Sequence, residues 1–472
     1  MCLVTAENTL GLPVAYASGF LLGEGRFIVT DLASLTQPGV TQATLRFRDG
    51  TTAVARQFGL ADPAIGLAVI RMDKEVADKP GLTLSAISVG EGGSDAAVVG
   101  WRWAEELDVT SGRITNGVKA AALATRLKIA APAGDLTFLE FEGVHVDAAP
   151  GSPILDRSAD VVGVLLKVPG ANRPLVVPAG VLRGALLSAE LQLKPLAELP
   201  KAVWPVAVQM IPGKPPTPQE FAQAIRSIRD RSRCTRCNGR GSIFVSRVTG
   251  TTRVGAISQS DTQTFPEPCP TCKGAGLVFK DGLYGMFQKM IEGAVRLNAS
   301  DAVDVKAKEA ASNNVMELMK SLHKAGPIYR SALSAQAKMD LVRTDLPYPR
   351  GAILYARVGG WVETPDGKYT LLELEGGKDV LAARTDDLQA VGDGKSPNRH
   401  WINLAGLIGG PVDLGEKHPI FIRPFGWAQA PSPESVKPPP EAGVPSVIPP
   451  PSTPNSSKTP RGTGGEPNFF GL

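Results

Sequence analysis

Two short cysteine motifs constrain this chain more than any other feature of its sequence. The segments CTRCNGRG (Cys234 to Gly241) and CPTCKGAG (Cys269 to Gly276) both follow the pattern Cys-x-x-Cys-x-Gly-x-Gly. The two-residue spacing lets both thiolates approach one ion from a tight turn, and the glycines allow the backbone to bend closely around it. Two such knuckles supply four sulfur ligands, the ligand set of a closed structural zinc site.

We therefore predict that Cys234, Cys237, Cys269 and Cys272 bind one structural zinc ion. The only other cysteine is Cys2, so the pattern is not the disulfide framework of a secreted domain. Redox-active dithiols and a small iron–sulfur site are the alternatives. A catalytic zinc is not expected, because four sulfur ligands leave no open position for water.

The paired motifs resemble the cysteine-rich region of DnaJ-type co-chaperones, down to the Gly-x-Gly ending. That region has four such repeats and binds two zinc ions, so the resemblance implies one ion here. The 31 residues between the knuckles are expected to form a hairpin. Because the His-Pro-Asp tripeptide of a J-domain does not occur in the sequence, stimulation of a chaperone ATPase is not supported. The resemblance implies at most the docking of polypeptides.

Residues 1–190 are short β-type runs separated by glycine and aspartate, which predicts an all-β barrel or sandwich. Their order resembles trypsin-like serine peptidases of the HtrA type, which implies a double β-barrel. The resemblance covers roughly 170 residues, with turn and strand signatures in the same order along the chain. The segments that carry it are ASGFLLGEGRFIVTDLASL, LRFRDGTTAVARQFGLADPAIGLAVIRM, SVGEGGSDAAVVGW, VTSGRITN and AAPGSPILDRSADVVGVLL.

The resemblance also implies that the catalytic triad is lost. Ala33 stands at the histidine position, Gly66 at the aspartate position and Pro150 at the position of the nucleophilic serine. Proline has no amide hydrogen, so one donor of the oxyanion hole is missing as well. A substitute pair of Ser152 and His145 is not expected to act, because a general base must reach the nucleophile from another part of the fold and needs an orienting group. We expect a pseudopeptidase and not an enzyme.

The remaining sequence divides by composition. We expect a proline-rich extended linker, a zinc-binding domain with a leading helix capped at Thr217, a connector containing a pair of packed helices, a small β-barrel and a disordered proline-rich tail. The predicted fold class is thus a mainly β multidomain protein. The predicted boundaries are 1–190, 191–216, 217–280, 281–343, 344–428 and 429–472.

The barrel predicted over 344–428 has the strand rhythm of an OB-fold, and an SH3-like barrel would give nearly the same pattern. Its aromatic residues Trp361, Tyr369 and Trp401 are candidates for stacking on nucleic-acid bases, although core packing is the favoured interpretation. Basic residues also crowd the knuckles, where they would contact phosphates or, more commonly, remain solvated surface charge. These residues are Arg231, Arg233, Arg236, Arg240 and Lys273.

The overall charge of +4 in 472 residues neither indicates nor excludes a nucleic-acid partner. No run of about 18 apolar residues predicts a membrane span, and the first residues lack the basic and cleavable segments of a signal peptide. We therefore expect a cytoplasmic protein. Strand-like residues begin almost at Met1, so an upstream segment missing from the gene model is an alternative.

Together these features predict a non-catalytic zinc-binding scaffold that binds proteins or extended polypeptides. The alternative is a nucleic-acid-binding protein that acts through the zinc region and the C-terminal barrel. An active serine peptidase is the least favoured interpretation, because all three triad positions are substituted.

Overall fold

The structure is a computed structural model of the 472-residue chain. No helix among the described residues is both long and apolar enough to cross a bilayer. The structure describes residues 1–433 except 24, 77–78, 87–92, 133–134, 144–145, 170, 172, 189–191, 255–256, 301–302, 324, 343–348, 365–366, 376–379 and 392–399. Most of the predicted tail, from residue 434, lies outside the described residues.

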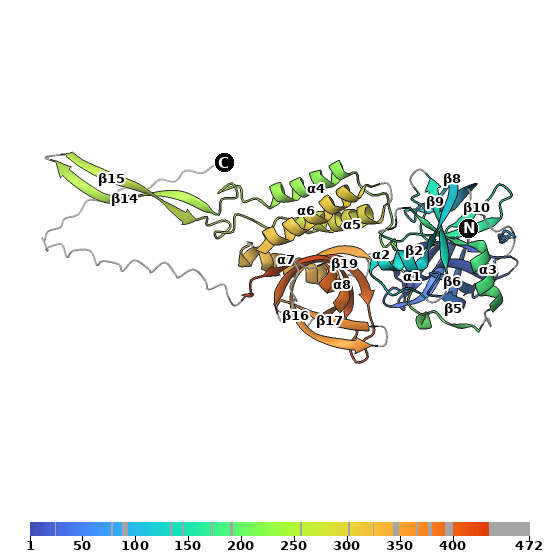
Figure 1. The fold of residues 1–472 in the computed structure, drawn as a ribbon. Helices are drawn as coiled ribbons and strands as arrows, with labels where there is room; N and C mark the ends of the chain where they lie inside the picture. The colour runs from blue at the N-terminus through green and yellow to red at the C-terminus, as the bar shows by residue number, and fades with distance from the viewer. Residues whose placement is uncertain are drawn as a thin grey trace, which may run out of the picture. The chain divides into compact units, whose positions relative to one another are not determined.

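The first part of the chain forms two closed six-stranded antiparallel barrels, which confirms the trypsin-like double barrel (Figure 1). In the first barrel the pairing of β5 with β6 closes the order β5-β4-β1-β2-β3-β6, and β13 (Lys194–Pro195) adds to the outer edge of β5. Its strands are β1 (Cys2–Asn8), β2 (Pro13–Leu21), β3 (Phe27–Asp31), β4 (Val40–Phe47), β5 (Thr52–Asp62) and β6 (Leu67–Met72).

The second barrel closes in the order β10-β11-β12-β9-β8-β7. Its core strand β11 (Val161–Leu166, VVGVLL) is buried at every position. The short helices α1 (Leu32–Leu35), α2 (Ala120–Leu127) and α3 (Ala179–Ser188) accompany the two barrels, and the sequence patterns did not predict them. The other strands are β7 (Ser94–Arg102), β8 (Glu106–Lys119), β9 (Thr137–Gly143), β10 (Pro153–Leu155) and β12 (Leu175–Pro178).

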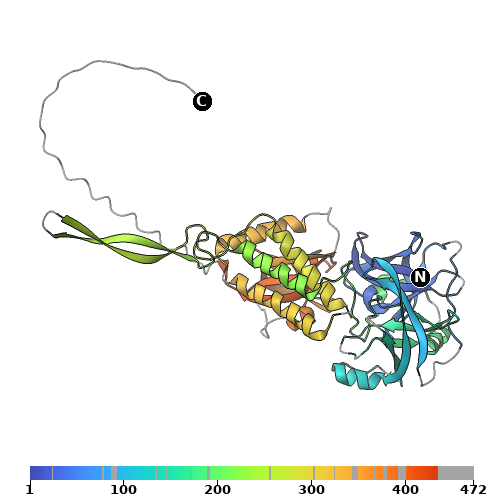
Figure 2. The same ribbon diagram turned by 90° about the horizontal axis from the view of Figure 1, so that it is seen from above.

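The cysteine region begins with α4 (Pro218–Ser232), whose start is the one predicted from Thr217. The Thr217 side chain accepts a hydrogen bond from Glu220 N, and the Glu220 carboxylate accepts one from Thr217 N, which completes a capping box. Between the knuckles, β14 (Ser242–Val254) and β15 (Ile257–Pro268) form the expected antiparallel hairpin, seen as a long twisted ribbon in Figures 1 and 2.

Three helices follow, not the expected pair: α5 (Leu283–Ala299), α6 (Val305–His323) and α7 (Pro327–Leu341). Together with α4 they bury their apolar faces in the same hydrophobic core as the C-terminal barrel. Figure 2 shows these helices layered over the barrel strands. The helical connector and the barrel are thus joined by one core, with Phe287 and Leu404 both fully buried in it.

The C-terminal barrel closes in the order β16-β17-β18-β20-β19, with β18 and β20 parallel and every other pair antiparallel. This is the Greek-key order of an OB-fold, and helix α8 (Thr385–Ala390) connects the third strand to the fourth. The structure therefore has the OB-like strand order and not the SH3-like alternative that the sequence also allowed. The strands are β16 (Arg350–Thr364), β17 (Gly367–Leu374), β18 (Val380–Arg384), β19 (Trp401–Pro411) and β20 (Ile420–Ala430).

Candidate metal centre and trypsin-like cleft

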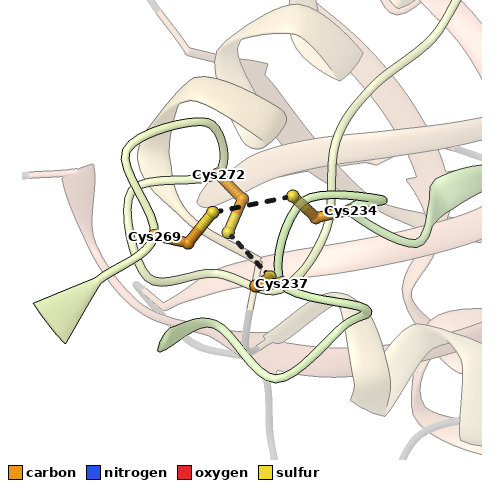
Figure 3. Close-up of side chains that lie close together, drawn as sticks. All are labelled: Cys234, Cys237, Cys269 and Cys272. Carbon is orange, nitrogen blue, oxygen red and sulfur yellow. Dashed lines mark hydrogen bonds between the residues drawn. The ribbon is translucent and has the colours of Figure 1, made fainter. Parts of the chain in front are cut away.

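The four predicted zinc ligands converge at one point. The Cys234 and Cys269 Sγ atoms lie 3.8 Å apart, and those of Cys237 and Cys272 lie 3.7 Å apart (Figure 3). All four sulfurs lie within 4.8 Å of one another, and all four residues are buried. These distances are far longer than a disulfide bond of about 2.05 Å. The cluster therefore has the form of a site that can hold one metal ion.

Backbone geometry builds this cluster from two matching turns. Gly241 N donates to Cys237 Sγ at 3.3 Å and Gly276 N donates to Cys272 Sγ at 3.2 Å. Both glycines adopt positive φ, at +79° and +72°. A Cβ on Gly241 would lie 2.4 Å from the carbonyl oxygen of Gly274, so the two knuckles approach too closely for any side chain there.

Burial and hydrogen bonds act in opposite directions on thiol ionisation in the cluster. Burial raises the pKa of a thiol, but backbone N–H groups of Cys272 and Thr271 and the neighbouring sulfurs lower the pKa of Cys269 to about 6. Burial and the neighbouring sulfurs raise the pKa of Cys272 to about 12. The cluster therefore favours a thiolate at Cys269, and a metal ion must displace the proton of Cys272 when it binds.

The three positions that the resemblance assigns to a catalytic triad also lie together, between the two barrels. Ala33 is buried in α1, and the carbonyl of Gly66 accepts a hydrogen bond of 3.0 Å from Leu32 N in the same helix. Gly151, which follows Pro150, lies so close to this helix that a Cβ would stand 2.7 Å from the amide of Asp31. None of the side chains at these positions carries a group that can transfer a proton or attack a carbonyl.

Ser152, which the sequence analysis considered as a substitute nucleophile, is fully buried, and its hydroxyl donates to the Ala149 carbonyl at 2.6 Å. Its oxygen is therefore committed to the loop backbone and does not face solvent. His145, the partner considered for it, lies outside the described residues.

The predicted linker does not run free of the barrels. Residues 203–213, which we call the strap, begin in the groove between them, where Trp204 is 2% exposed, whereas Met210 and Ile211 are buried in the core that the helices share with the C-terminal barrel. The Trp204 indole N–H donates to Ala64 O at 2.6 Å, and its ring packs edge-on against Phe138. Four backbone hydrogen bonds hold the strap: Val203 N to Pro63 O (3.1 Å), Ala207 N to Lys167 O (2.7 Å), Tyr16 N to Gln209 O (2.8 Å) and Gly213 N to Trp103 O (2.9 Å).

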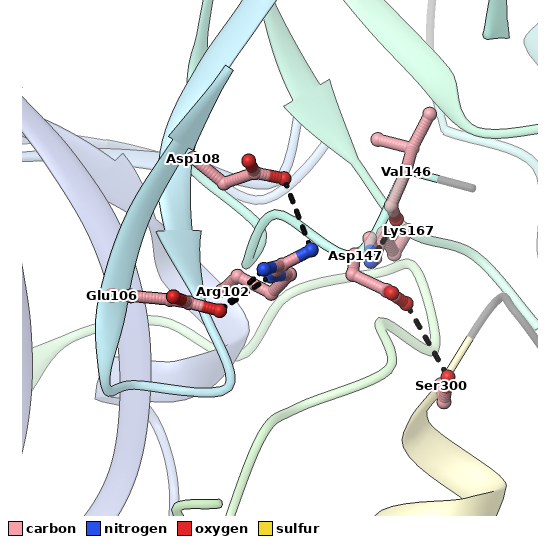
Figure 4. Close-up of polar contacts among 7 residues, drawn as sticks. All are labelled: Arg102, Glu106, Asp108, Val146, Asp147, Lys167 and Ser300. Atoms are coloured by element: carbon pink, nitrogen blue, oxygen red, sulfur yellow. Dashed lines mark hydrogen bonds and ion pairs between the residues drawn. The ribbon is translucent and has the colours of Figure 1, made fainter. Parts of the chain in front are cut away.

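Little space is left beside Pro150. A cavity of about 30 Å³, enough for one or two water molecules, is lined by barrel residues together with Ile211 of the strap and Ser300 at the end of α5. Figure 4 shows two hydrogen bonds beside this cavity. Ser300 Oγ donates to Asp147 Oδ1 at 3.3 Å, and Lys167 Nζ donates to Val146 O at 2.6 Å. Across the same view, Arg102 is ion-paired with Glu106 and Asp108.

The three aromatic residues considered for base stacking have different environments. Tyr369 is fully buried, and Trp401 stacks on Tyr355 with a centroid separation of 4.7 Å. Only Trp361 of the three is exposed, by 58%, with Lys368 Nζ 3.8 Å from its ring centre. Core packing, the favoured interpretation, thus accounts for Tyr369, and of the three candidates only Trp361 offers an exposed ring.

No protein-family model matches the chain, and no curated protein matches it. Among solved structures it is similar to the HtrA-type protease AlgW with a tripeptide, at 17% identity and a TM-score of 0.33, over 40% of this chain and 58% of that one. It is also similar to the active form of the Rv3671c protease from M. tuberculosis, at 18% identity and a TM-score of 0.33, over 43% of this chain and 85% of that one. The chain thus spans less than two thirds of the AlgW structure. Likenesses this distant carry no information on activity.

Proposed function

We propose that this chain is a non-catalytic binding protein whose partner-binding hairpin is held by one structural zinc ion. The observation that carries the proposal is the spacing of the four sulfurs. A tetrahedral ion with Zn–S bonds of about 2.3 Å requires sulfurs about 3.8 Å apart. The Cys234–Cys269 and Cys237–Cys272 separations are 3.8 and 3.7 Å, and every other pair lies within 4.8 Å. The compact cluster favours one ion over an iron–sulfur cluster, which would hold its ligands further apart.

The proposal of a non-catalytic role rests on the trypsin-like domain. Ala33, Gly66 and Pro150 supply no nucleophile and no general base, and the strap fills the groove beside them. We therefore assign this domain a structural role, and we place partner binding elsewhere on the chain.

The element best suited to bind a polypeptide is the β14–β15 hairpin. Its strands form a two-stranded sheet, so each has an edge whose backbone groups can pair with an added strand. Val248 is 62% exposed and Phe265 is 39% exposed, so apolar side chains accompany these edges. The partner proposed is an extended polypeptide segment that adds to one edge.

Metal analysis of the purified full chain tests the zinc. We expect about one equivalent of zinc per chain, and loss of that metal in the Cys234→Ser/Cys269→Ser variant. Cys2→Ala is the matched control, because Cys2 is buried in the first barrel and lies outside the cluster. Iron in place of zinc, or no metal in the unmodified chain, would disprove this part of the proposal.

Binding to reduced, carboxymethylated lactalbumin, a permanently unfolded polypeptide, tests the hairpin. We expect Val248→Ser/Phe265→Ser to weaken binding about tenfold, since the apolar contacts beside the strand edge are lost. Leu10→Ser/Val109→Ser is the control, because these residues are 65% and 61% exposed in the trypsin-like domain. Equal effects of the two double variants would exclude the hairpin as the binding element.

A further inference from the structure

Positive charge is concentrated in one short segment of this chain. Residues 226–240 contain six arginines and one aspartate, a net charge of +5, whereas the entire chain carries +4. All six arginines are exposed. The rest of the molecule is therefore nearly neutral, and the field of the protein is dominated by this segment.

The arginines are arranged along a continuous path. Arg226 and Arg229 are three residues apart near the end of α4, so they share one side of the helix, and Arg233 is the extended residue that follows its last turn. The buried residues Ile225, Ile228 and Ser232 occupy a different side.

The path continues onto the first knuckle. The Arg233 side chain lies against Gly239, with its Cγ 3.2 Å from where a Cβ would stand, and its guanidinium donates to Asn238 Oδ1 at 3.4 Å. Arg236 and Arg240 belong to this same knuckle and are exposed. We call the five residues Arg226, Arg229, Arg233, Arg236 and Arg240 the basic ridge.

No carboxylate side chain in the described part of the chain pairs with the basic ridge, although four thiolates around one zinc ion in the adjacent cluster would carry a net charge of about −2. Among the described residues, no carboxylate forms an ion pair with any of its five arginines, and the polar partner of Arg233 is a neutral amide. Arginines elsewhere behave differently: Arg56 pairs with Asp73, Arg157 with Asp95 and Arg357 with Glu373. A row of unpaired guanidinium groups is suited to contact successive phosphates of a polyanion.

An exposed aromatic side chain follows the ridge closely in the sequence. Phe244 is 66% exposed at the base of β14, four residues after Arg240. Guanidinium groups that track a backbone, combined with an aromatic ring open to solvent, are the pattern by which proteins bind single strands without strict sequence preference.

We propose that the basic ridge, with Phe244, binds single-stranded nucleic acid. The phosphates would lie along the arginines and a base would stack on Phe244. This activity is independent of the polypeptide site proposed on the hairpin edges, because it depends on different side chains. It also differs from readout by the C-terminal barrel, whose Tyr369 is buried.

Fluorescence anisotropy with a labelled oligothymidylate of about 20 nucleotides tests the proposal on the full zinc-loaded chain. We expect binding that weakens with salt, and a loss of about tenfold in affinity for Arg236→Gln/Arg240→Gln, with the slope of log K against log salt reduced by about 1.4. Phe244→Ala is expected to weaken oligothymidylate binding without changing that slope, because stacking releases no counterions.

The matched control is Arg48→Gln/Arg126→Gln, which removes two exposed arginines from the trypsin-like domain. Zinc content and circular dichroism of every variant verify that the knuckles remain folded. Absence of binding by the unmodified chain, or equal losses in the two double variants, would overturn the proposal. So would ridge-dependent binding to anionic phosphatidylserine vesicles with no binding to the oligonucleotide.

Discussion

The carbonyl of Gly66 accepts a hydrogen bond of 3.0 Å from the amide of Leu32, beside Ala33. This contact brings the histidine and aspartate positions of a trypsin-like triad together, although neither position carries a reactive side chain. The contact thus joins two loops at positions whose side chains offer no proton-transfer group.

Restoring the triad is expected to leave the chain inactive. In the variant Ala33→His/Gly66→Asp/Pro150→Ser, residue 66 must keep a φ of +70°, and its Cβ would stand 3.2 Å from a Leu166 methyl group. The strap also still fills the groove. We expect no casein hydrolysis and no labelling by a fluorophosphonate probe. The unmodified chain should likewise remain unlabelled at Ser152, and labelling of either protein would contradict the structural role assigned to this domain.

Trp204→Ala is expected to release the strap. The substitution removes a nearly fully buried indole and its hydrogen bond to Ala64, so we expect a loss of about 3–5 kcal/mol in the free energy of unfolding. Limited digestion with trypsin should then cut after Lys201, which is followed by Ala202, faster than in the unmodified chain. Trp361→Ala serves as the control, since that side chain is 58% exposed. Unchanged cleavage would show that Trp204 does not hold the strap.

Asp31→Asn is expected to stabilise the protein at neutral pH. Burial raises the pKa of Asp31 from 3.8 to about 6, against hydrogen bonds from Ser34, and its Oδ1 has no partner. The folded state therefore binds more protons than the unfolded state between about pH 4 and 6, so stability falls as pH rises through this range. Urea unfolding should show a gain that approaches roughly 3 kcal/mol for the variant above pH 6 and disappears below pH 4. A gain independent of pH would contradict the assignment.

Gly241→Ala is expected to disrupt the metal centre without touching a sulfur. Its Cβ would collide with the Gly274 carbonyl, so the knuckles must separate and zinc affinity should fall at least tenfold in a chelator competition. Gly250→Ala in β14 is the matched control, because the nearest atom to its new Cβ is a flexible Asp261 oxygen at 3.6 Å. If both variants bind zinc equally well, the close packing of the knuckles is not what holds the sulfurs.

Features set by local chemistry were predictable from the sequence. The cap at Thr217 depends on residues three apart, and the closeness of each cysteine pair depends on two intervening residues. The double barrel was also predictable, because its turns and strand alternation occur in a recognisable order.

The strap was not predicted, although its signal is visible in retrospect. Trp204, Val206, Val208 and Met210 alternate with other residues in the manner of a half-buried strand. The neighbouring prolines favoured the prediction of an extended linker, because proline has no backbone N–H to donate to a partner strand. The groove that accepts the strap exists only when both barrels are folded, so no local pattern could indicate it. The third helix, α7, was missed because its apolar positions serve a core shared with a distant barrel.

The strap has a consequence for any peptide that approaches the groove between the barrels. Because residues 203–213 are covalently attached to the barrel they occupy, they act as an intramolecular ligand at an effective concentration of about millimolar or higher. An external peptide would have to displace the strap, which stays attached to the barrels when it dissociates from the groove. A peptide could therefore enter the groove between the barrels only by displacing a segment of the same chain.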